Sequence, residues 1–421
     1  MSLPVRHLPV VQNWDCHVCG SCCKEYLVTV TDEERRRLEA QGWDKDALIG
    51  GRPLFRKSGP WWARKYHLNS REDGSCVFLS EQGRCRVHEK FGYATKPLPC
   101  RLFPFVLVPT GDHWRVGIRF ACPSSAANKG RPVSAHEGSL REFAALLARR
   151  EGLDDEPAAL RPPRLQGRLR LDWPDLLRLV ESLSSIVKNR KDRVERRLRK
   201  CLALAELCRQ ARLDDIKGQR LVELVRIFVA SLENEVPADP STLPQPNWVG
   251  RVLFRQSVAL FTRKDHGPDS GLARGRRLAL LSAALRFARG RGPVPRMHKK
   301  IPETTFDQIE ATSTPQDGGV EEILERYYTI KIESLQFCGA ANLGLSVWDG
   351  FEVLALTYPL LMWVTRAMRD VPPAEAVTRA LTIVDDHFGF NPVLGTLRQR
   401  IGFRLLGRTE QLPRLIAWYG R

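Results

Sequence analysis

Apolar residues recur at three- and four-residue spacing along most of the chain after residue 135, with Pro- and Gly-rich breaks between the segments. This period places apolar side chains on one face of an α-helix, so it predicts a series of helices that pack together. We therefore expect residues 135–421 to form an all-α helical domain. The predicted helices cover residues 139–149, 174–187, 198–211, 219–233, 252–261, 277–288, 321–335 and 351–368.

The most apolar stretch of the chain lies inside the last of these predicted helices. VLALTYPLLMWVT, residues 353–365, has only 13 residues, and Glu352 and Arg366 flank it. A membrane-spanning helix needs about 20 apolar residues. A helix that is buried inside the helical domain is therefore the better interpretation.

The first 123 residues show a different pattern, with short elements that leave little material for a core. YLVTV (26–30) is rich in β-branched residues and predicts a strand. In TDEE, Thr31 and Glu34 have the spacing of a capping box, which predicts the start of a helix that Gly42 can end. A bound metal would supply stability that such elements lack, because the free energy of metal binding becomes folding free energy.

A hairpin is predicted near the end of this part. FVLVPTGDHWRVGIRF (105–120) has a turn sequence at Thr110–Asp112, and Pro109 restricts its strand to the edge of a sheet. The sequence after it has the composition of a linker. We predict a cysteine-cluster domain over 1–123, a linker over 124–134 and the helical domain over 135–421. The expected fold class is mainly α, with a small irregular cysteine-rich α+β metal-binding domain followed by the all-α domain.

The cysteines are concentrated in the N-terminal part. The chain has 11 cysteines, and eight of them lie between Cys16 and Cys122. The N-terminus has no apolar run long enough for a signal peptide, so we expect a cytoplasmic protein. Thiols stay reduced in the cytoplasm, and a dense cysteine cluster there is more typical of a metal site than of disulfides.

The spacing of these cysteines predicts metal ligands. Two sulfurs of a C-x-x-C turn can converge on one metal, and three cysteines at this interval also suit a cubane iron–sulfur cluster with a remote fourth ligand. The expected cofactor is therefore an iron–sulfur cluster (4Fe–4S) or zinc. The candidate ligands are Cys16, Cys19, Cys22, Cys23, Cys76, Cys85, Cys100 and Cys122.

The division of these ligands among sites is open. Cys22 and Cys23 are adjacent, so their side chains diverge and they are poor partners on one metal. One partition places Cys16, Cys19, Cys22 and Cys122 on one centre and Cys23, Cys76, Cys85 and Cys100 on another. A single site with spare thiols is equally compatible with the spacing. Among the nearby histidines at positions 17, 67, 88 and 113, only His88 is a candidate ligand.

The chain is basic, with a formal net charge of +18 that is spread along its length. KNRKDRVERRLRK (188–200) is the one local concentration of positive charge. A solvated helix face is the simplest interpretation of this run. A zinc-stabilised module that contacts nucleic acid or an acidic protein partner is the alternative function class. Positive charge near the cysteines would also offset thiolates around a metal.

The N-terminal motifs resemble a known family. CHVCGSCCK (16–24), followed in order by CVFL (76–79), CRVH (85–88) and CRLFPF (100–105), is similar to the YkgJ-type CxxCxxCC cysteine-cluster proteins, which are described as zinc- or iron-chelating. The resemblance covers about the first 123 residues. It implies a metal-binding domain in that part of the chain.

The overall layout is also similar to that of flagellin lysine N-methylases, which carry a related domain before a long helical region. CRVHEKFGYATKPLPCR (85–101) resembles that subgroup most closely. This resemblance implies methyl transfer from S-adenosylmethionine to a lysine of a protein substrate such as flagellin, supported by an iron–sulfur cluster. The first cysteines depart from that subgroup, because their spacing is the tight CxxCxxCC of the generic family. Catalytic residues stay unassigned.

Overall fold

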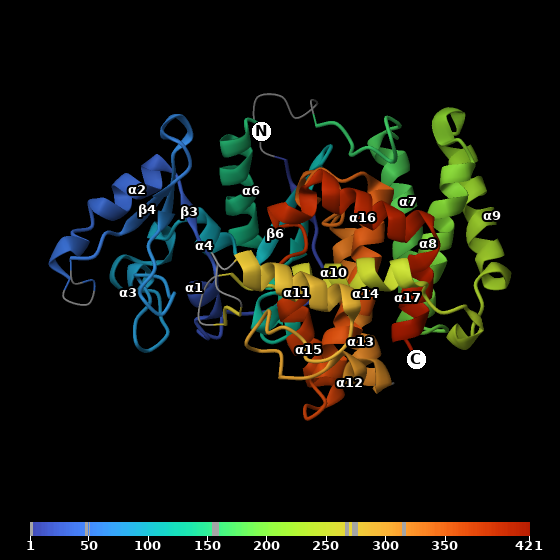
Figure 1. Cartoon of the computed structure of the whole chain (residues 1–421). Coiled ribbons are helices and arrows are strands. Elements are labelled where there is room, and N and C mark those ends of the chain that lie inside the picture. The colour runs from blue at the N-terminus through green and yellow to red at the C-terminus, as the bar shows by residue number, and fades with distance from the viewer. Residues whose placement is uncertain are drawn as a thin grey trace.

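The computed structural model describes residues 3–46, 49, 51–153, 160–265, 269–271, 277–313 and 317–421. The structure is 56% helical and its few strands lie in small sheets near the N-terminus, which confirms the predicted mainly α class. Figure 1 shows a small N-terminal lobe, drawn in blue shades, beside a larger body of helices. We call residues 15–102 the cysteine lobe, and the larger body the helical body.

The strands of the described residues form three small sheets. Their orders are β1-β7-β6, β2-β8 and β3-β5-β4, and only the β1–β7 pair is parallel. The predicted strand over 26–30 is shorter than expected, because Tyr26 ends the preceding helix as its C-cap. The strands are β1 (Val5–His7), β2 (Asn13–Trp14), β3 (Thr29–Val30), β4 (Phe55–Ser58), β5 (Lys65–Leu68), β6 (Phe105–Thr110), β7 (His113–Ile118) and β8 (Arg131–Pro132).

Short helices connect these strands, and one of them begins with the predicted capping box. The Thr31 hydroxyl accepts a hydrogen bond from the Glu34 amide at 3.2 Å, and the Glu34 carboxylate accepts one from the Thr31 amide at 2.9 Å. The two bonds satisfy two backbone donors at the helix start. The helices are α1 (Ser21–Glu25), α2 (Asp32–Glu39), α3 (Arg86–Phe91), α4 (Leu98–Leu102) and α5 (Pro123–Ala126).

The predicted hairpin is confirmed as β6 and β7. Its strands pair antiparallel from Phe105–Ile118 to Thr110–His113, and Gly111 takes the left-handed conformation that the turn requires, with φ +63°. β6 is an edge strand, as Pro109 predicted.

The segment expected to be a linker, 124–134, contains regular structure. It holds most of α5 as well as β8, and Val133 is buried. Proline at the first position favours the start of α5, because its fixed φ suits a helix and its missing N–H costs nothing there. The domain boundaries stay a prediction, but this stretch packs as part of the fold.

The helical body contains every helix that the apolar period predicts, with bounds within a few residues. The period did not single out α12, α15, α16 and α17. The helices are α6 (Glu137–Glu151), α7 (Trp173–Lys188), α8 (Val194–Gln210), α9 (Gln219–Glu235), α10 (Trp248–Thr262), α11 (Arg277–Arg289), α12 (Phe306–Ala311), α13 (Gly318–Glu333), α14 (Val347–Ala367), α15 (Pro373–Val384), α16 (Leu397–Arg408) and α17 (Gln411–Tyr419).

The helix around VLALTYPLLMWVT is the centre of this body. All residues of α14 except Asp349 are buried, which confirms the predicted buried helix. Figure 1 shows α14 enclosed by α10, α13, α15 and α17. Within the described ranges, no helix is long and apolar enough to cross a bilayer.

Two hydrophobic cores are present. The larger one joins the helical body to the β1-β7-β6 sheet, so Phe105 and Trp114 pack with the helices. The smaller one lies in the cysteine lobe and has eight buried apolar residues, with Cys76, Cys85 and Cys100 packed against it. A core of this size contributes little stability by itself.

Residues 188–191 of the basic run are exposed, but its helical part, 194–200, is buried and is not a solvated face, which corrects the simplest interpretation for that part. Arg196, Arg197 and Arg199 are at least nine-tenths buried, and carboxylates surround them. Arg197 pairs with Glu325 at 2.6 Å, and Arg199 pairs with Glu195 at 2.5 Å. Burial of these cations is tolerated because each guanidinium has a carboxylate partner and donates hydrogen bonds to groups within the chain.

A buried ion pair ties the end of β7 to the helical body. Lys331 Nζ lies 2.7 Å from Asp385 Oδ1, and the two side chains are 1% and 0% exposed. Asp385 Oδ2 accepts hydrogen bonds from the Phe120 and Ala121 amides at 2.5 and 3.2 Å. Lys331 also donates to the Ile118 carbonyl at 3.2 Å. The pair therefore holds the backbone of residues 118–121 against α13 and the end of α15.

We expect Asp385→Asn to lower the free energy of unfolding by about 3–5 kcal/mol, because it leaves the Lys331 ammonium buried without a counter-charge. Urea unfolding followed by circular dichroism measures the change.

The matched control is Asp385→Asn combined with Lys331→Met, which removes both charges. The double variant should recover part of the loss. A double variant as unstable as the sum of the two single variants would contradict the assigned coupling.

Candidate metal centre

The CxxCxxCC motif forms a loop and the first turn of α1. Gly20 adopts φ +68° immediately before α1, a conformation that suits glycine. Cys22 and Cys23 then lie within the helix, half-buried, with their Sγ atoms 4.0 Å apart. Cys16 and Cys19 lie in the exposed loop before it.

The second pair of cysteines comes from a loop that pairs with α1. The Cys76 amide donates to the Cys23 carbonyl at 2.6 Å, so the two segments are joined through their backbones. Cys85 forms a β-bridge with Leu79 and is the N-cap of α3. Both thiols are half-buried against the small core.

Cys100 reaches the same region from α4. The Glu34 carboxylate of the capping box also accepts the Leu98 amide at 2.6 Å, so α2 fixes the start of α4. Cys100 lies two residues into that helix and packs on the small core. One glutamate therefore begins one helix and orients another that carries a thiol.

Five thiols from these three segments line one cavity of about 640 Å³. Burial, together with the neighbouring Cys85 and Cys22, raises the pKa of Cys76 to about 12. Burial, with Cys76 and the same two neighbours, raises the pKa of Cys100 well above its usual range. The hydrogen bond with Cys23, followed by burial, raises the pKa of Cys22 strongly. These thiols are close enough for each negative charge to disfavour the next.

Lys96 provides positive charge among these thiols. Burial lowers the pKa of Lys96, but the sulfurs of Cys85, Cys100 and Cys23 outweigh it, so that the pKa is raised overall. No carboxylate in the described parts of the chain forms an ion pair with Lys96. The cation therefore has the cysteines as its electrostatic partners, which suits a site where thiolates must form.

The remaining candidate ligands lie outside this cavity. Cys122 is buried as the N-cap of α5, where burial raises its pKa. Cys16 and Cys19 stay in their exposed loop. The structure thus brings together Cys22, Cys23, Cys76, Cys85 and Cys100, and the two-centre partition stays a prediction. Cys201, Cys208 and Cys338 are buried in the helical body, as expected of core residues.

The nearby histidines have partners of their own. His17 Nδ1 lies 3.0 Å from the Ser124 hydroxyl, His67 bonds Thr29 and Ser58, and His113 Nδ1 lies 2.7 Å from Asp112. His88 is exposed and lies edge-on to Tyr93. The cavity walls include none of these four rings.

The donor atoms of these side chains suit a thiophilic metal. In the described ranges, no three His, Cys, Asp or Glu side chains already form a ligand group. The set of five thiols with one cation suits iron or zinc, which bind thiolates, and not a hard cation that prefers oxygen.

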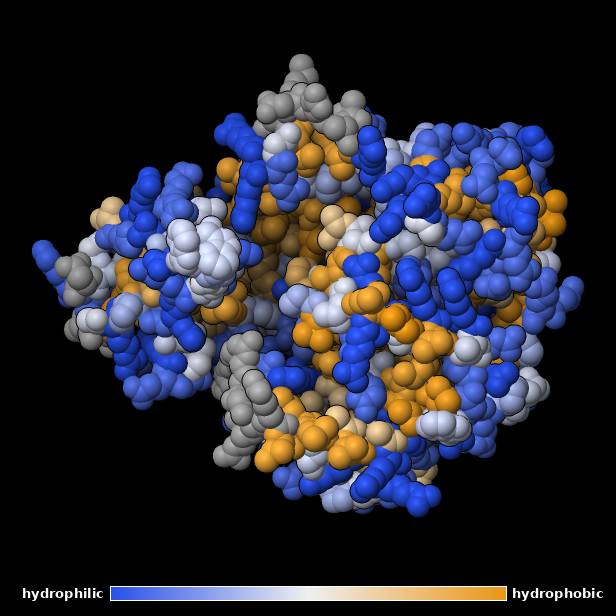
Figure 2. All heavy atoms as spheres, turned by 45° about the horizontal axis from the view of Figure 1, so that its top comes forward, coloured by the Kyte–Doolittle hydropathy of each residue, from blue (hydrophilic) through white to orange (hydrophobic). Residues whose placement is uncertain are grey.

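The cavity lies between the cysteine lobe and the helical body. Its far wall includes Arg119, Leu147, Asp386 and Phe390, which sequence analysis did not single out. Figure 2 shows the hollow between the lobe and the body, with apolar residues in its depth. Arg119 and Asp386 are 267 residues apart, so no local pattern signals that they meet.

A charged network fastens α1 to the helical body beside this cavity. Glu25 of α1 pairs with Lys300 at 2.7 Å and with Lys264 at 3.3 Å. Lys264 also lies 2.6 Å from Asp386, and Lys300 lies 2.9 Å from Asp269. The helix that carries Cys22 and Cys23 is therefore held from both sides, by Cys76 and by these cations.

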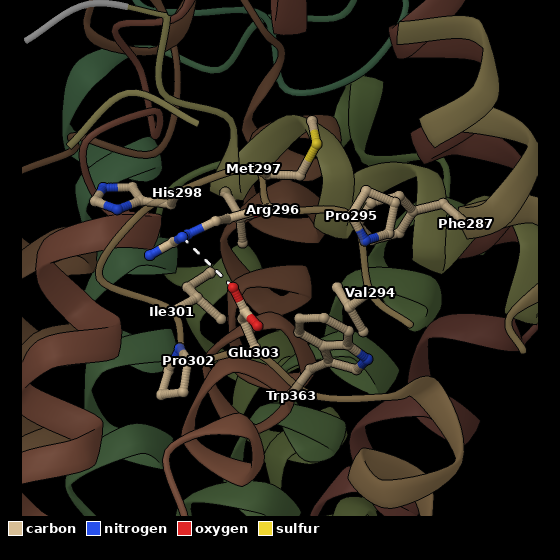
Figure 3. Close-up of a pocket in the computed structure, with 11 residues that line it drawn as sticks. Phe287, Val294, Pro295, Arg296, Met297, His298, Ile301, Pro302, Glu303 and Trp363 are labelled. Atoms are coloured by element: carbon tan, nitrogen blue, oxygen red, sulfur yellow. Dashed lines mark ion pairs between the residues drawn. The ribbon is translucent and has the colours of Figure 1, made fainter. Parts of the chain in front are cut away.

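His298 lies in the loop that supplies Lys300 to this network. Figure 3 shows the loop folded against Trp363, with the Arg296–Glu303 ion pair across it. The His298 ring is 3% exposed, and its Nδ1 accepts a hydrogen bond from the Lys300 amide at 3.1 Å. Burial, with the adjacent cations Lys264 and Lys300, lowers the pKa of His298 to about 4.

We expect the free energy of unfolding to fall between pH 6.5 and pH 4, because the unfolded chain binds a proton at His298 that the folded chain rejects. The stability from this residue is complete above pH 6.5, and its loss amounts to about 3 kcal/mol at pH 4. Urea unfolding across this pH range measures the slope. His298→Gln should flatten it, whereas His88→Gln at an exposed position should not; equal slopes for both variants would contradict the assignment.

A comparison with protein-family models gives one finding. Residues 15–124 match the model of the CxxCxxCC family, which is described as a "Putative zinc- or iron-chelating domain". Neither the curated proteins nor the solved structures contain a match to this chain. The matched range covers the loop, α1 and every cysteine from Cys16 to Cys122. Residues 15–124 therefore match a domain family that is described as zinc- or iron-chelating.

Proposed function

We propose that the cysteine lobe holds an iron–sulfur cluster of the 4Fe–4S type or a zinc ion on its thiolates. The observation that carries this proposal is the convergence of five cysteines, from three separate segments, on one cavity with Lys96 among them. A cysteine that only fills space in a core does not require other thiols or a cation beside it. Five thiols and a cation in one small lobe favour a bound metal over ordinary burial.

Protons on these thiols compete with a metal for the sulfur atoms. Only the thiolate is a good ligand, and the pKa of Cys76 is raised to about 12. A metal must therefore displace protons when it binds, so its affinity rises with pH. The protons leave more easily once the metal's own positive charge is present.

The small core gives the metal a structural role as well. The described residues of the lobe include eight buried apolar residues in this core, which are few for its length, and three of the cavity's cysteines pack directly against them. Bonds from a metal to Cys23, Cys76, Cys85 and Cys100 would join α1, the 76–85 loop and α4. Binding of the metal would then stabilise the lobe directly.

Methyl transfer and nucleic-acid binding stay predictions. Methyl transfer from S-adenosylmethionine to a lysine of a protein such as flagellin is supported by the resemblance in layout alone. It is tested by incubation of the reduced protein with methyl-labelled S-adenosylmethionine and a cell extract. Contact with nucleic acid was based on the basic run, whose principal cations are paired within the chain; low-salt binding to DNA and RNA tests it.

Cys85→Ser should remove most of the bound iron or zinc, because it deletes one of the thiols at the cavity. Anaerobic purification, metal analysis and a visible spectrum measure the result. Absorption near 400 nm is the expected signature of a cluster, and a colourless protein with stoichiometric zinc is that of the ion.

Two variants serve as matched controls for this experiment. Cys208→Ser changes a thiol that is buried in α8, and should keep the wild-type metal content. Cys122→Ser changes a thiol that lies in the matched range but outside the cavity, and should also keep the wild-type metal content. Equal metal content in all three variants, or no iron and no zinc in the wild type, would defeat the proposal.

Lys96→Met should weaken metal binding by about tenfold or more, because the thiolates lose the cation that offsets their charge. Competition with a chromogenic chelator measures the affinity. Lys96→Arg keeps the charge and should restore much of the affinity, whereas Lys129→Met, in a turn outside the cavity, should have no effect. Equal affinities for Lys96→Met and Lys96→Arg would show that charge at this position is irrelevant.

A further inference from the structure

The cavity beside the cysteines is larger than a metal centre requires. Its volume of about 640 Å³ lies in the range of sites that hold small organic molecules. The five thiols and Lys96 occupy one part of its wall, and the rest extends to α6, β6 and the end of α15. Space for a second molecule is therefore continuous with the space for the metal.

The remaining walls are largely apolar and come from both parts of the protein. Val28 and Leu102 line the cavity from the cysteine lobe, and Leu107, Leu147 and Phe390 line it from the helical body. Phe390 is 44% exposed and Leu27, at the same cavity, is 49% exposed. Apolar side chains around an open hollow indicate a ligand with an apolar surface.

Arg119 supplies a specific polar group on the far wall. Its guanidinium lies 3.7 Å from the centre of the Phe390 ring and 4.9 Å from that of Tyr26. One terminal nitrogen donates to the carboxylate of Asp386 at 3.3 Å and to its carbonyl at 3.2 Å, so the guanidinium is held in place as part of the wall.

The electrostatics of the cavity select against an anion. Thiolates around a divalent ion or a cubane core carry a net negative charge, which Lys96 offsets only in part. Beyond the thiols, the three cations Arg119, Lys264 and Lys300 are balanced by the three carboxylates Asp386, Glu25 and Asp269. Neither end has a free positive charge for an anionic ligand, so an uncharged molecule suits the cavity best.

We propose that this cavity binds an uncharged, largely apolar organic molecule that lies between the cysteine cluster and Arg119. This inference rests on the proposed metal centre for the charge of the ligand. The apolar walls stand apart from it. The molecule would contact the lobe and the body together.

Nile red tests this inference, because it is an uncharged aromatic dye with a carbonyl oxygen and its fluorescence rises in apolar surroundings. The full chain with its metal content measured should bind one dye per molecule. Leu147→Trp and Val28→Phe enlarge side chains on opposite walls and should each weaken binding about tenfold or more.

Leu177→Trp is the matched control, because Leu177 on α7 is also half-buried but lies outside the cavity. It should bind the dye as the wild type does. Circular dichroism establishes that each variant is folded. The anionic dye 1-anilinonaphthalene-8-sulfonate should fail to displace Nile red from the metal-loaded protein.

Three results would overturn the inference. They are no binding to metal-loaded wild type, unchanged binding in both Leu147→Trp and Val28→Phe, and displacement by the anionic dye. Unchanged binding would place the dye elsewhere, for example on the exposed leucines 278, 281 and 285 of α11. A wild-type protein without iron or zinc defeats the proposed metal centre instead, and the variant series then still reports on the apolar walls.

Discussion

The ion pair between Lys331 and Asp385 is the constraint that fixes the end of β7 and the following segment against the helices. Asp385 accepts the amides of Phe120 and Ala121, and Lys331 donates to the carbonyl of Ile118, so four contacts in a dry interior fix one short segment. Burial of two charges is costly unless every hydrogen-bonding atom finds a partner. The segment therefore has one favourable position, and β6 and β7 pack with the helices. The far wall of the cavity, from β6 to Arg119, is set by that position.

The cysteine lobe, unlike the helical body, has little buried apolar surface to stabilise it. It has a small apolar core, several short helices, and thiols in places where a larger domain would have aliphatic side chains. It is attached to the body by Leu98 and Leu102, which pack with the larger core, and by ion pairs of Glu25 with Lys264 and Lys300 and of Arg101 with Glu142. Since a small core contributes little stability, bonds to a metal would stabilise such a lobe directly.

How far the sequence predicts this structure follows from the range of each interaction. The helices of the body follow from local apolar spacing, and the capping box at Thr31 from four consecutive residues. The short helices α1, α3 and α4 lack a full period, and contacts such as the Glu34–Leu98 bond position them instead. The motif identified the thiols. It could not identify Arg119 or Asp386 as their neighbours across the cavity, because that proximity is created only by the folded body.

Lys96 connects the chemistry of the metal with that of the cavity. A site built only of thiols would hold a strongly negative centre, and a hollow beside it would attract cations from solution. Lys96 offsets part of the charge on the sulfurs, and Arg119, Lys264 and Lys300 are matched by Asp386, Glu25 and Asp269, so the apolar walls decide what enters. The lobe supplies the thiols and Lys96, while the body supplies Arg119 and part of the apolar wall. Neither part alone encloses the space.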